Sequence, residues 1–279
     1  MKKLKSITIT TKYELTKVDH KIIKSIKAFI NKSKFKNDYK FKHWKQIYTL
    51  DFILIHIIYL FKNNFKWRSL GSVYSNIYKH YIKLQTINTF KNTYLELLKK
   101  YLEKTKYKTL KNVYTDTTFI INKKGIDFIG RNKYMKNKNC NKISIITDSK
   151  FIPIDIKIVK GNVNDSKIIQ NQMAIILENK EYIKYFFADK GYCSKNIRKI
   201  LRDNGIHPII DYNNRNTKDE LKKRYLTKEE NKLYTKRIYI EHIFGNYKFF
   251  PKLGQRYEQY IHNYEGLMYL YFINNIYNL

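Results

Sequence analysis

The sequence predicts an α/β protein in which a mixed sheet is flanked by helices and preceded by a basic region made only of helices. Apolar residues recur with a helical period up to about residue 105. From residue 111 onward, short runs rich in Val, Ile, Thr, Tyr and Phe are typical of strands. With 279 residues, 43% of them hydrophobic, the chain is long and apolar enough for one large domain or two smaller ones.

Four helices are expected in the first part of the chain, at 18–30, 46–61, 69–83 and 86–100. The first is amphipathic and the second mostly apolar, and Ser69 and Thr86 are placed as N-caps of the other two. The short break between the last two helices leaves room for a helix-turn-helix unit. An ordinary helical bundle fits the same pattern equally well.

Strands are expected after this region, at 112–121, 142–148, 151–159, 185–188 and 206–210. In the third of them, isoleucine stands at every second position from Ile152 to Ile158, which marks one buried face. The fourth is a fully apolar run and is therefore expected to be buried on both faces.

Further helices are expected at 165–178, at 194–205, from 217 onward, at 234–249 and at 262–277. Asp165 is placed as the cap of the first, and Gly205 ends the second. Thr217 and Glu220 have the spacing of a capping box at the start of the third. The resulting order of three strands, helix, strand, helix, strand and then helices predicts a mixed sheet.

The composition excludes several classes of protein. The longest apolar run, residues 52–61, is shorter than the roughly 20 residues of a membrane-spanning helix. No apolar segment follows the N-terminal lysines, as it would in a signal peptide. Two cysteines cannot build a disulfide framework or a four-thiolate zinc site, and the histidines include no HExxH pair. We therefore expect a soluble protein that stays inside the cell and does not contact membranes.

The net charge indicates a polyanionic partner. Lys and Arg number 56 against 23 acidic residues, a formal charge of +33, and nucleic acid is the usual partner of such a protein. Codon bias is a competing explanation, because 48 of the 56 basic residues are lysine and Gly, Pro and Ala are scarce. The first 110 residues hold 25 basic and 6 acidic side chains, and the rest hold 31 and 17. This asymmetry predicts a binding region followed by a region that holds most of the acids available for chemistry.

Three acids stand at positions where a fold could use them. Asp116 lies inside an expected strand, Asp189 follows an apolar strand, and Glu241 lies among apolar residues of an expected helix. An acid at a strand end is more often a cap, but aspartate is depleted within strands and a buried glutamate needs a partner. Three such acids in one domain indicate a shared cation.

The spacing around Glu241 is more specific. Tyr234, Arg237, Glu241 and Lys248 fall within roughly 60° of one another on a helix with about 100° per residue. An exposed surface stripe with an Arg–Glu pair is the simpler explanation. Against it, the composition gives only about 0.005 chance matches to this spacing in the chain.

The Tyr-x2-Arg-x3-Glu-x6-Lys pattern resembles the signature of insertion-sequence DDE transposases. Similar segments are YTDTTFI around Asp116, GRNKYMKNKNCNKISIITD, GNVNDS, FADKGY around Asp189, LGQRYE and, more loosely, FKNNFKWRSL. One departure is Lys150–Phe151, where these enzymes often place a glycine turn. The resemblance spans roughly residues 45–275. It implies a basic helical DNA-binding region at residues 1–105 and an RNase H-like catalytic domain at residues 106–279.

The resemblance also implies the chemistry. Asp116, Asp189 and Glu241 would be the catalytic residues and would bind Mg²⁺, with Mn²⁺ as a substitute and two ions in the site. The reaction would be hydrolysis at the ends of a mobile element, followed by transfer of the 3′-ends into target DNA. Arg237 and Lys248 would contact the DNA backbone, and Tyr234 would either position a phosphate or pack. Two further acids, Asp148 and Asp165, are interpreted as structural.

Double-stranded DNA is the expected partner, at the element ends and at the target. Joining two ends indicates a homodimer during the reaction. The protein would act where its DNA is, in the cytoplasm or the nucleus depending on the host. Two alternatives stay open: a nuclease that cuts without joining, and a captured transposase that now only binds DNA. A basic structural protein without a site is a third interpretation, and it predicts no dependence on divalent ions.

Overall fold

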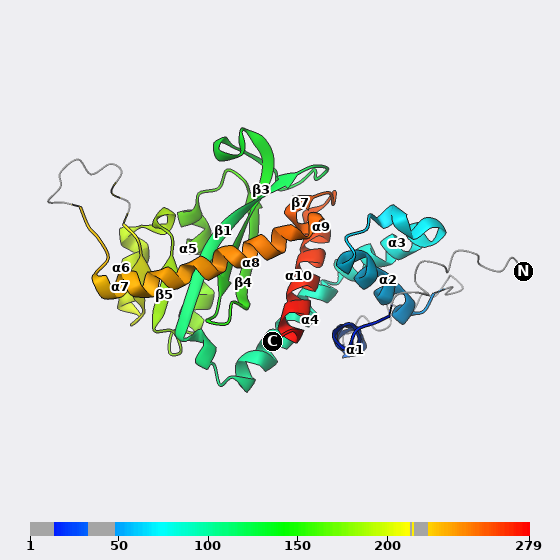
Figure 1. Cartoon of the computed structure of the whole chain (residues 1–279), viewed down its shortest axis with the longest axis horizontal. Coiled ribbons are helices and arrows are strands. Elements are labelled where there is room, and N and C mark those ends of the chain that lie inside the picture. The colour runs from blue at the N-terminus through cyan, green and yellow to red at the C-terminus, as the bar shows by residue number, and fades with distance from the viewer. Residues whose placement is uncertain (1–13, 33–47, 213, 215–222) are drawn as a thin grey trace, which may run out of the picture. The chain divides into compact units, whose positions relative to one another are not determined.

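The computed structural model describes residues 14–32, 48–212, 214 and 223–279. These residues form two compact units (Figure 1). The helical unit comprises the described residues up to Lys99 together with Phe250–Leu253 and Glu258–Leu279. The sheet unit comprises Lys100–Phe249 and Gly254–Tyr257. The structure confirms the predicted fold class, because helices flank a mixed sheet and the described residues before the sheet are mostly helical.

The helical unit is built from helices α1 to α4 and α10, at Lys17–Lys32, Leu50–Lys62, Tyr74–Thr86, Thr89–Lys104 and Ile261–Tyr277. Helix α4 continues past Lys99 into the sheet unit. No helix in the described ranges is long and apolar enough to cross a lipid bilayer.

Two predicted N-caps are wrong. Ser69 lies inside a 3₁₀ segment, Trp67–Val73, and Thr86 is the last residue of α3, where its hydroxyl donates to the carbonyl of Lys83. Gly71 is the reason for the first error: its φ of 60° breaks the helical backbone, so the regular helix begins only at Tyr74.

Helix α10 completes the core of the helical unit. It packs against α1 and α3, and Leu267, Met268 and Leu270 are buried within it. The buried hydroxyl of Tyr81 on α3 donates to the main-chain carbonyl of Asn263 on α10. The sequence instead predicts one catalytic domain at residues 106–279 that includes α10, and that division remains a prediction about functional regions.

The sheet has seven strands, β1 to β7, at Asn112–Asn122, Gly130–Asn132, Lys138–Thr147, Pro153–Lys160, Tyr185–Ala188, His207–Ile210 and Gln255–Arg256. Five of them match the predicted runs, whereas β2 and β7, three and two residues long, were not predicted. The alternation from Ile152 to Ile158 does mark a buried face, since all four isoleucines are buried.

Strand β1 is the centre of the sheet and has different neighbours along its two edges. Strand β3 pairs with it antiparallel over Tyr114–Ile121 on one edge. On the other edge, the parallel strand β5 pairs only with Asn112–Tyr114, and β7 only with Ile121 and Asn122. In the part of the chain that the structure describes, residues 115–120 of β1 therefore have no strand partner on that edge.

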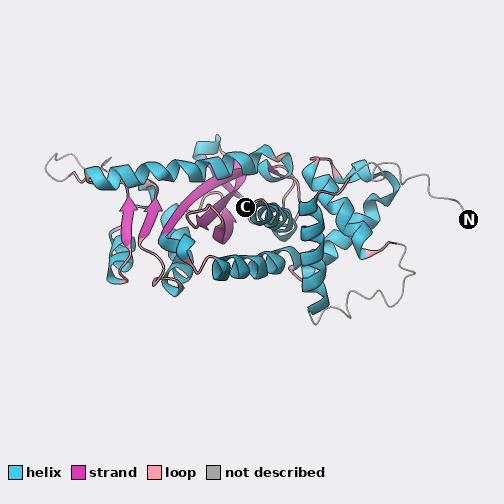
Figure 2. Ribbon diagram, turned by 60° about the horizontal axis from the view of Figure 1, so that its bottom comes forward, coloured by secondary structure: helices cyan, strands magenta, loops and turns pink. Residues whose placement is uncertain are grey.

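Helices cover both faces of the sheet (Figure 2). Helices α5 to α9 span Asp165–Glu178, Lys195–Asp203, Lys228–Tyr234, Ile238–Phe249 and Pro251–Gly254. Helix α5 packs against β3 and β4, whereas α8 runs across β1 (Figure 1). Consecutive side chains of a strand point to opposite faces, so neighbouring residues of β1 face different helices.

Two details of these helices differ from the prediction, and a third prediction cannot be compared with the structure. The N-cap of α5 is Asn164 and not Asp165, because the Asn164 Oδ1 atom accepts from the amide of Ser166. The helix expected at 234–249 is broken by a 3₁₀ turn, Thr235–Arg237. The capping box expected at Thr217 and Glu220 lies outside the described residues.

Candidate active site

Asp116 and Asp189 are brought together by the register of two parallel strands. Tyr114 of β1 pairs with Phe187 of β5. Asp116 lies two residues after Tyr114, and Asp189 lies two residues after Phe187. Residues at matching positions in parallel strands point to the same face. Asp116 lies at the start of the unpaired stretch of β1, and Asp189 directly follows the end of β5.

Arg237 connects Asp116 to the third predicted acid. Its Nη1 atom donates to the Asp116 Oδ2 atom at 3.0 Å, and its Nη2 atom donates to the Glu241 Oε1 atom at 2.9 Å. Arg237 lies in the 3₁₀ turn and Glu241 in the first turn of α8, so the end of this helix delivers both side chains to β1. One guanidinium thus stands between two carboxylates.

Of the other two predicted residues, the structure places one at this site. The Tyr234 hydroxyl donates to the Asp189 Oδ1 atom at 3.4 Å, and the guanidinium of Arg237 lies 5.6 Å from the centre of the Tyr234 ring. Lys248 lies seven residues beyond Glu241, about 10 Å further along α8. Within the described ranges, no hydrogen bond or ion pair joins Lys248 to the three acids.

The electrostatics of the site oppose the ionised form of Asp116. The pKa of Asp116 is raised from 3.8 to about 6, because burial and, to a smaller extent, the charge of Asp189 raise it by more than Arg237 and the amide of Thr117 lower it. Burial also raises the pKa of Tyr234 to about 12. For Arg237, burial alone would lower the pKa, but the surrounding acids raise it above its usual value. Any additional cation near Asp116 would stabilise the ionised form of its carboxylate.

The donor atoms fit a hard divalent cation, but they do not form a complete ligand set. Asp116, Asp189 and Glu241 offer only carboxylate oxygens, which are the ligands that Mg²⁺ and Mn²⁺ prefer. Among the described residues, no three acidic, histidine or cysteine side chains lie close enough together to hold a metal ion. The guanidinium of Arg237 occupies the position between Asp116 and Glu241, so it acts as the cation there.

The two acids interpreted as structural both have several partners. Asp148 is buried in the turn between β3 and β4, where it accepts from the amides of Lys150 and Ile152 and from the hydroxyl of Tyr101. Phe151, in the position where a glycine turn was noted as missing, has a φ of 61°. That value explains why glycine suits this position.

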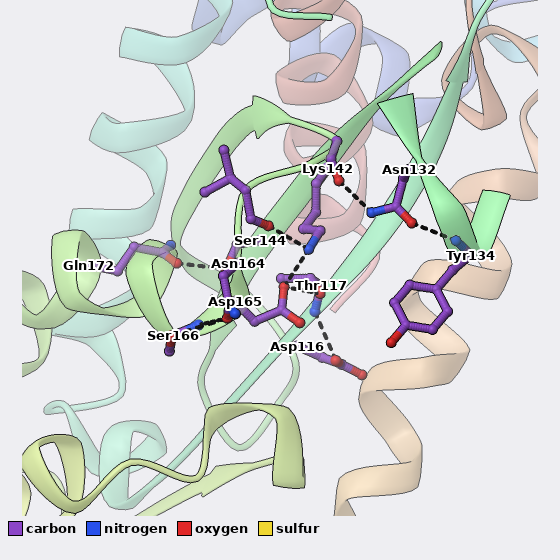
Figure 3. A network of polar contacts seen from close by, with 12 residues as sticks. Asp116, Thr117, Asn132, Tyr134, Lys142, Ser144, Asn164, Asp165, Ser166 and Gln172 are labelled. Carbon is purple, nitrogen blue, oxygen red and sulfur yellow. Dashed lines mark hydrogen bonds and ion pairs between the residues drawn. The ribbon is translucent and has the colours of Figure 1, made fainter. Parts of the chain in front are cut away.

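Asp165 lies close to the site, although the sequence predicts for it only the role of a helix cap. Its carboxylate binds Lys142 and Thr117 on the face of the sheet opposite Asp116 (Figure 3). Tyr192, in the turn after Asp189, is buried, and its pKa is raised first by burial and then by the charges of Asp116 and Asp165. Sequence reasoning missed Thr117, Lys142 and Tyr192. Of these three residues, only Lys142 has a distinctive place in the sequence, as a lysine directly before the apolar residues of β3.

Residues 111–276 match the family model described as the transposase DDE domain. No relative is found among curated proteins. Among solved structures, the chain is similar to the Mos1 transposase paired-end complex with left transposon end, at 11% identity and a TM-score of 0.33, covering 92% of this chain and 95% of that chain. The Mos1 strand transfer complex is similar at 11% identity and a TM-score of 0.34, covering 95% and 96%. These structural likenesses are distant, and the family match is the finding that bears on this chain.

Proposed function

The chain belongs to the transposase DDE domain family, and from this membership we propose that it cleaves DNA at the ends of a mobile element and joins the 3′-ends to target DNA. Asp116, Asp189 and Glu241 are the proposed catalytic carboxylates. The observation that carries the proposal is the meeting of Asp116 and Asp189 at one level of β1 and β5, with Glu241 joined to the same place through Arg237.

The three carboxylates would hold divalent ions, with Mg²⁺ as the physiological choice, Mn²⁺ as a substitute, and two ions in the site. When bound, such ions supply Lewis-acid chemistry that activates a water or 3′-hydroxyl nucleophile and stabilises the leaving oxygen. Asp116 must give up its proton to act as a ligand, and its raised pKa of about 6 leaves it ionised above neutral pH.

Arg237 has two alternative anionic partners in this proposal. In the DNA-free chain it neutralises Asp116 and Glu241. With cations in the site, its guanidinium is free to bind a DNA phosphate in forked geometry. The Tyr234 hydroxyl, already directed at Asp189, is placed to orient a phosphate at the same point. Lys248 would contact the DNA backbone outside the carboxylate cluster.

The proposed partners are double-stranded DNA and a second copy of the chain. The net charge of +33 favours DNA and opposes association of two free copies. We therefore expect the homodimer to form on DNA, which neutralises both chains. Sedimentation of the chain with and without an end-containing duplex tests this expectation.

The decisive experiment uses a supercoiled plasmid that carries the gene with its native flanks. Purified protein is incubated with it in Mg²⁺, Mn²⁺ or EDTA, beside the Asp189→Asn variant. Asp203→Asn is the matched control, because Asp203 is an exposed aspartate of the same unit at the end of α6. Metal-dependent cuts at the flanks are expected from the wild type and from Asp203→Asn, but not from Asp189→Asn.

The same experiment separates the alternative functions. Cuts at the flanks without joined products would indicate a nuclease that does not transfer strands. DNA bound but uncut under every metal condition would indicate a captured protein that only binds. Normal cutting by Asp189→Asn would reject the assignment of the carboxylates.

A further inference from the structure

The carboxylate of Asp165 is directed into the sheet, although its helix begins at that residue. Asn164 already serves as the N-cap of α5, so capping does not need Asp165. Instead, the Asp165 Oδ1 atom accepts from the Lys142 Nζ atom at 2.8 Å and from the Thr117 hydroxyl at 3.1 Å (Figure 3). Its other oxygen lies 3.6 Å from where a Cβ atom of Gly191 would be, in the turn after Asp189.

Lys142 makes this contact from a buried position. The residue is 5% exposed, and its ammonium donates both to Asp165 and to the carbonyl of Val163 at 2.7 Å, while lying 4.9 Å from the centre of the Phe119 ring. Only the lysine of this ion pair is buried, since the Asp165 side chain is 29% exposed. Burying the lysine charge costs desolvation energy that the attraction of its partner often only balances, so stability alone is a weak reason for the contact. The contact between Lys142 and Asp165 is better explained by the residue that it holds in place.

Thr117 is the residue that the pair fixes. Its side chain faces α5 and binds Asp165, and its amide donates to the Asp116 Oδ1 atom at 2.8 Å. Among the residues that the structure describes, this part of β1 has no strand neighbour on the edge beyond β5, so the described sheet holds it from one side only. The contact between Thr117 and Asp165 attaches β1 to α5 at the residue next to Asp116.

We propose that Lys142 and Asp165 are positioning residues that hold Thr117, and through its amide the carboxylate of Asp116, in the orientation needed to bind a divalent cation. The proposal rests on the proposed function. It adds three residues, on β1, β3 and α5, that act through the carboxylate of Asp116 and not on the reacting atoms. Substitution of groups that orient metal ligands commonly costs 10- to 100-fold in metal affinity or activity.

The structure provides a matched control for this contact. Ser144 lies directly opposite Thr117 across the β1–β3 pair, and its hydroxyl donates to the Gln172 Oε1 atom of α5 at 2.6 Å. Gln172 in turn donates to Asp155 at 2.9 Å. Thr117 and Ser144 thus each attach a strand to α5 through one hydroxyl, but only Thr117 adjoins Asp116.

The test compares Thr117→Val, Thr117→Ser and Ser144→Ala with the wild type. Valine keeps the shape and strand preference of threonine and removes only the hydroxyl. Mn²⁺ affinity is measured by electron paramagnetic resonance with an end-containing duplex present, and single-turnover cleavage is measured at saturating DNA. Thr117→Val is expected to lose about tenfold in both, with unchanged DNA affinity, while Thr117→Ser stays within about twofold of wild type.

Ser144→Ala is expected to bind Mn²⁺ and cleave as the wild type does, even where it unfolds more easily. Equal losses in Ser144→Ala and Thr117→Val would overturn the proposal, and so would a Thr117→Val protein that matches the wild type in Mn²⁺ affinity. The double variant Lys142→Met/Asp165→Asn removes both charges together and is expected to lose Mn²⁺ affinity by about tenfold. A wild type that neither binds Mn²⁺ nor cleaves would instead reject the proposed function, and this proposal with it.

Discussion

At the scale of single residues, Asp116 shows how a candidate active site works against stability. Its pKa of about 6 lies above the ordinary value of 3.8, so the fold favours the protonated form. The stabilisation that this gives is present below about pH 4 and is lost as the pH rises through 6. Asp116→Asn cannot ionise, and we expect it to be more stable than the wild type at pH 8 by up to about 3 kcal/mol.

Urea unfolding in EDTA at pH 8 and pH 4 measures this difference. The advantage of Asp116→Asn should be present at pH 8 and absent at pH 4, and the exposed Asp203→Asn should show none at either pH. An Asp116→Asn protein less stable than the wild type at pH 8 would contradict the expectation. It would mean that the ion pair with Arg237 outweighs the cost of burial.

Arg237 gives a second prediction at this scale, because it competes with a divalent cation for Asp116 and Glu241. Removing one positive charge this close to the ligands should favour the bound ion by roughly 1–2 kcal/mol, or about tenfold. We expect Arg237→Gln to bind Mn²⁺ about tenfold more tightly than the wild type at pH 8 without DNA, and to cleave DNA more slowly.

Lys236→Gln is the matched control for that titration. Lys236 is exposed, precedes Arg237 directly and carries the same charge. Its removal should change Mn²⁺ affinity by less than about twofold, since screening weakens interactions between exposed charges. If both variants gain Mn²⁺ affinity equally, the gain comes from the lower net charge of the protein. It would then not come from losing the contacts of Arg237 with Asp116 and Glu241.

At the scale of elements, one buried arginine attaches the last strand to the sheet. Arg256 of β7 is fully buried, and its guanidinium donates to the side chain and, at 2.7 Å, the main-chain carbonyl of Asp127. Its own carbonyl accepts from the amide of Lys123 at 2.9 Å. Arg256→Ala removes a fully buried side chain and one donor to the buried Asn141 Oδ1 atom, so we expect a loss of about 2–3 kcal/mol in the free energy of unfolding.

Urea unfolding of the full chain measures this loss. Arg131→Ala is the control, because Arg131 lies on the exposed side of β2 in the same part of the sheet. A substitution there should change stability by less than about 0.5 kcal/mol. Equal effects of the two substitutions would show that β7 is not held by Arg256.

The pattern of apolar residues predicts those helices and strands whose formation depends on neighbouring residues in the sequence. The apolar run at Tyr185–Ala188 gave β5 with both of its ends correct. The spacing of Arg237 and Glu241 predicted a shared face, but the ion pair with Asp116 joins residues 121 positions apart and has no local signal. The unpaired stretch of β1 was unpredictable for the same reason, because it depends on where β5 ends and β7 begins.

At the scale of the whole molecule, the order of the helices along the chain does not predict which of them pack into the same unit. The spacing of apolar residues predicts α10 at 262–277, which is nearly its observed range. It does not predict the unit to which α10 belongs. Eleven of its residues are buried, and within the helical unit it packs against α1 and α3. Glu258, just before α10, accepts from the indole of Trp67 at 2.8 Å and from the hydroxyl of Tyr78 at 2.9 Å.

This grouping predicts that residues 1–105 do not form a stable unit on their own. Without residues 258–279, the apolar faces of α1 and α3 are exposed, and burial of such faces is the main source of stability in small helical units. We expect the fragment 1–105 to unfold without a cooperative transition. The same fragment joined to residues 258–279 by a flexible linker should unfold cooperatively, as followed by far-ultraviolet circular dichroism in urea.

The same pair of fragments tests whether the basic region binds DNA as a folded surface or through charge alone. Residues 1–105 carry 23 basic and 6 acidic side chains, so both fragments should bind DNA more weakly as salt rises, because phosphate contacts release counterions. A folded surface fixes the number of contacts and should favour particular duplexes. We therefore expect only the fragment with residues 258–279 to prefer a duplex from the element's ends over a scrambled one. Equal preference in both fragments would show that recognition of the ends lies elsewhere in the chain.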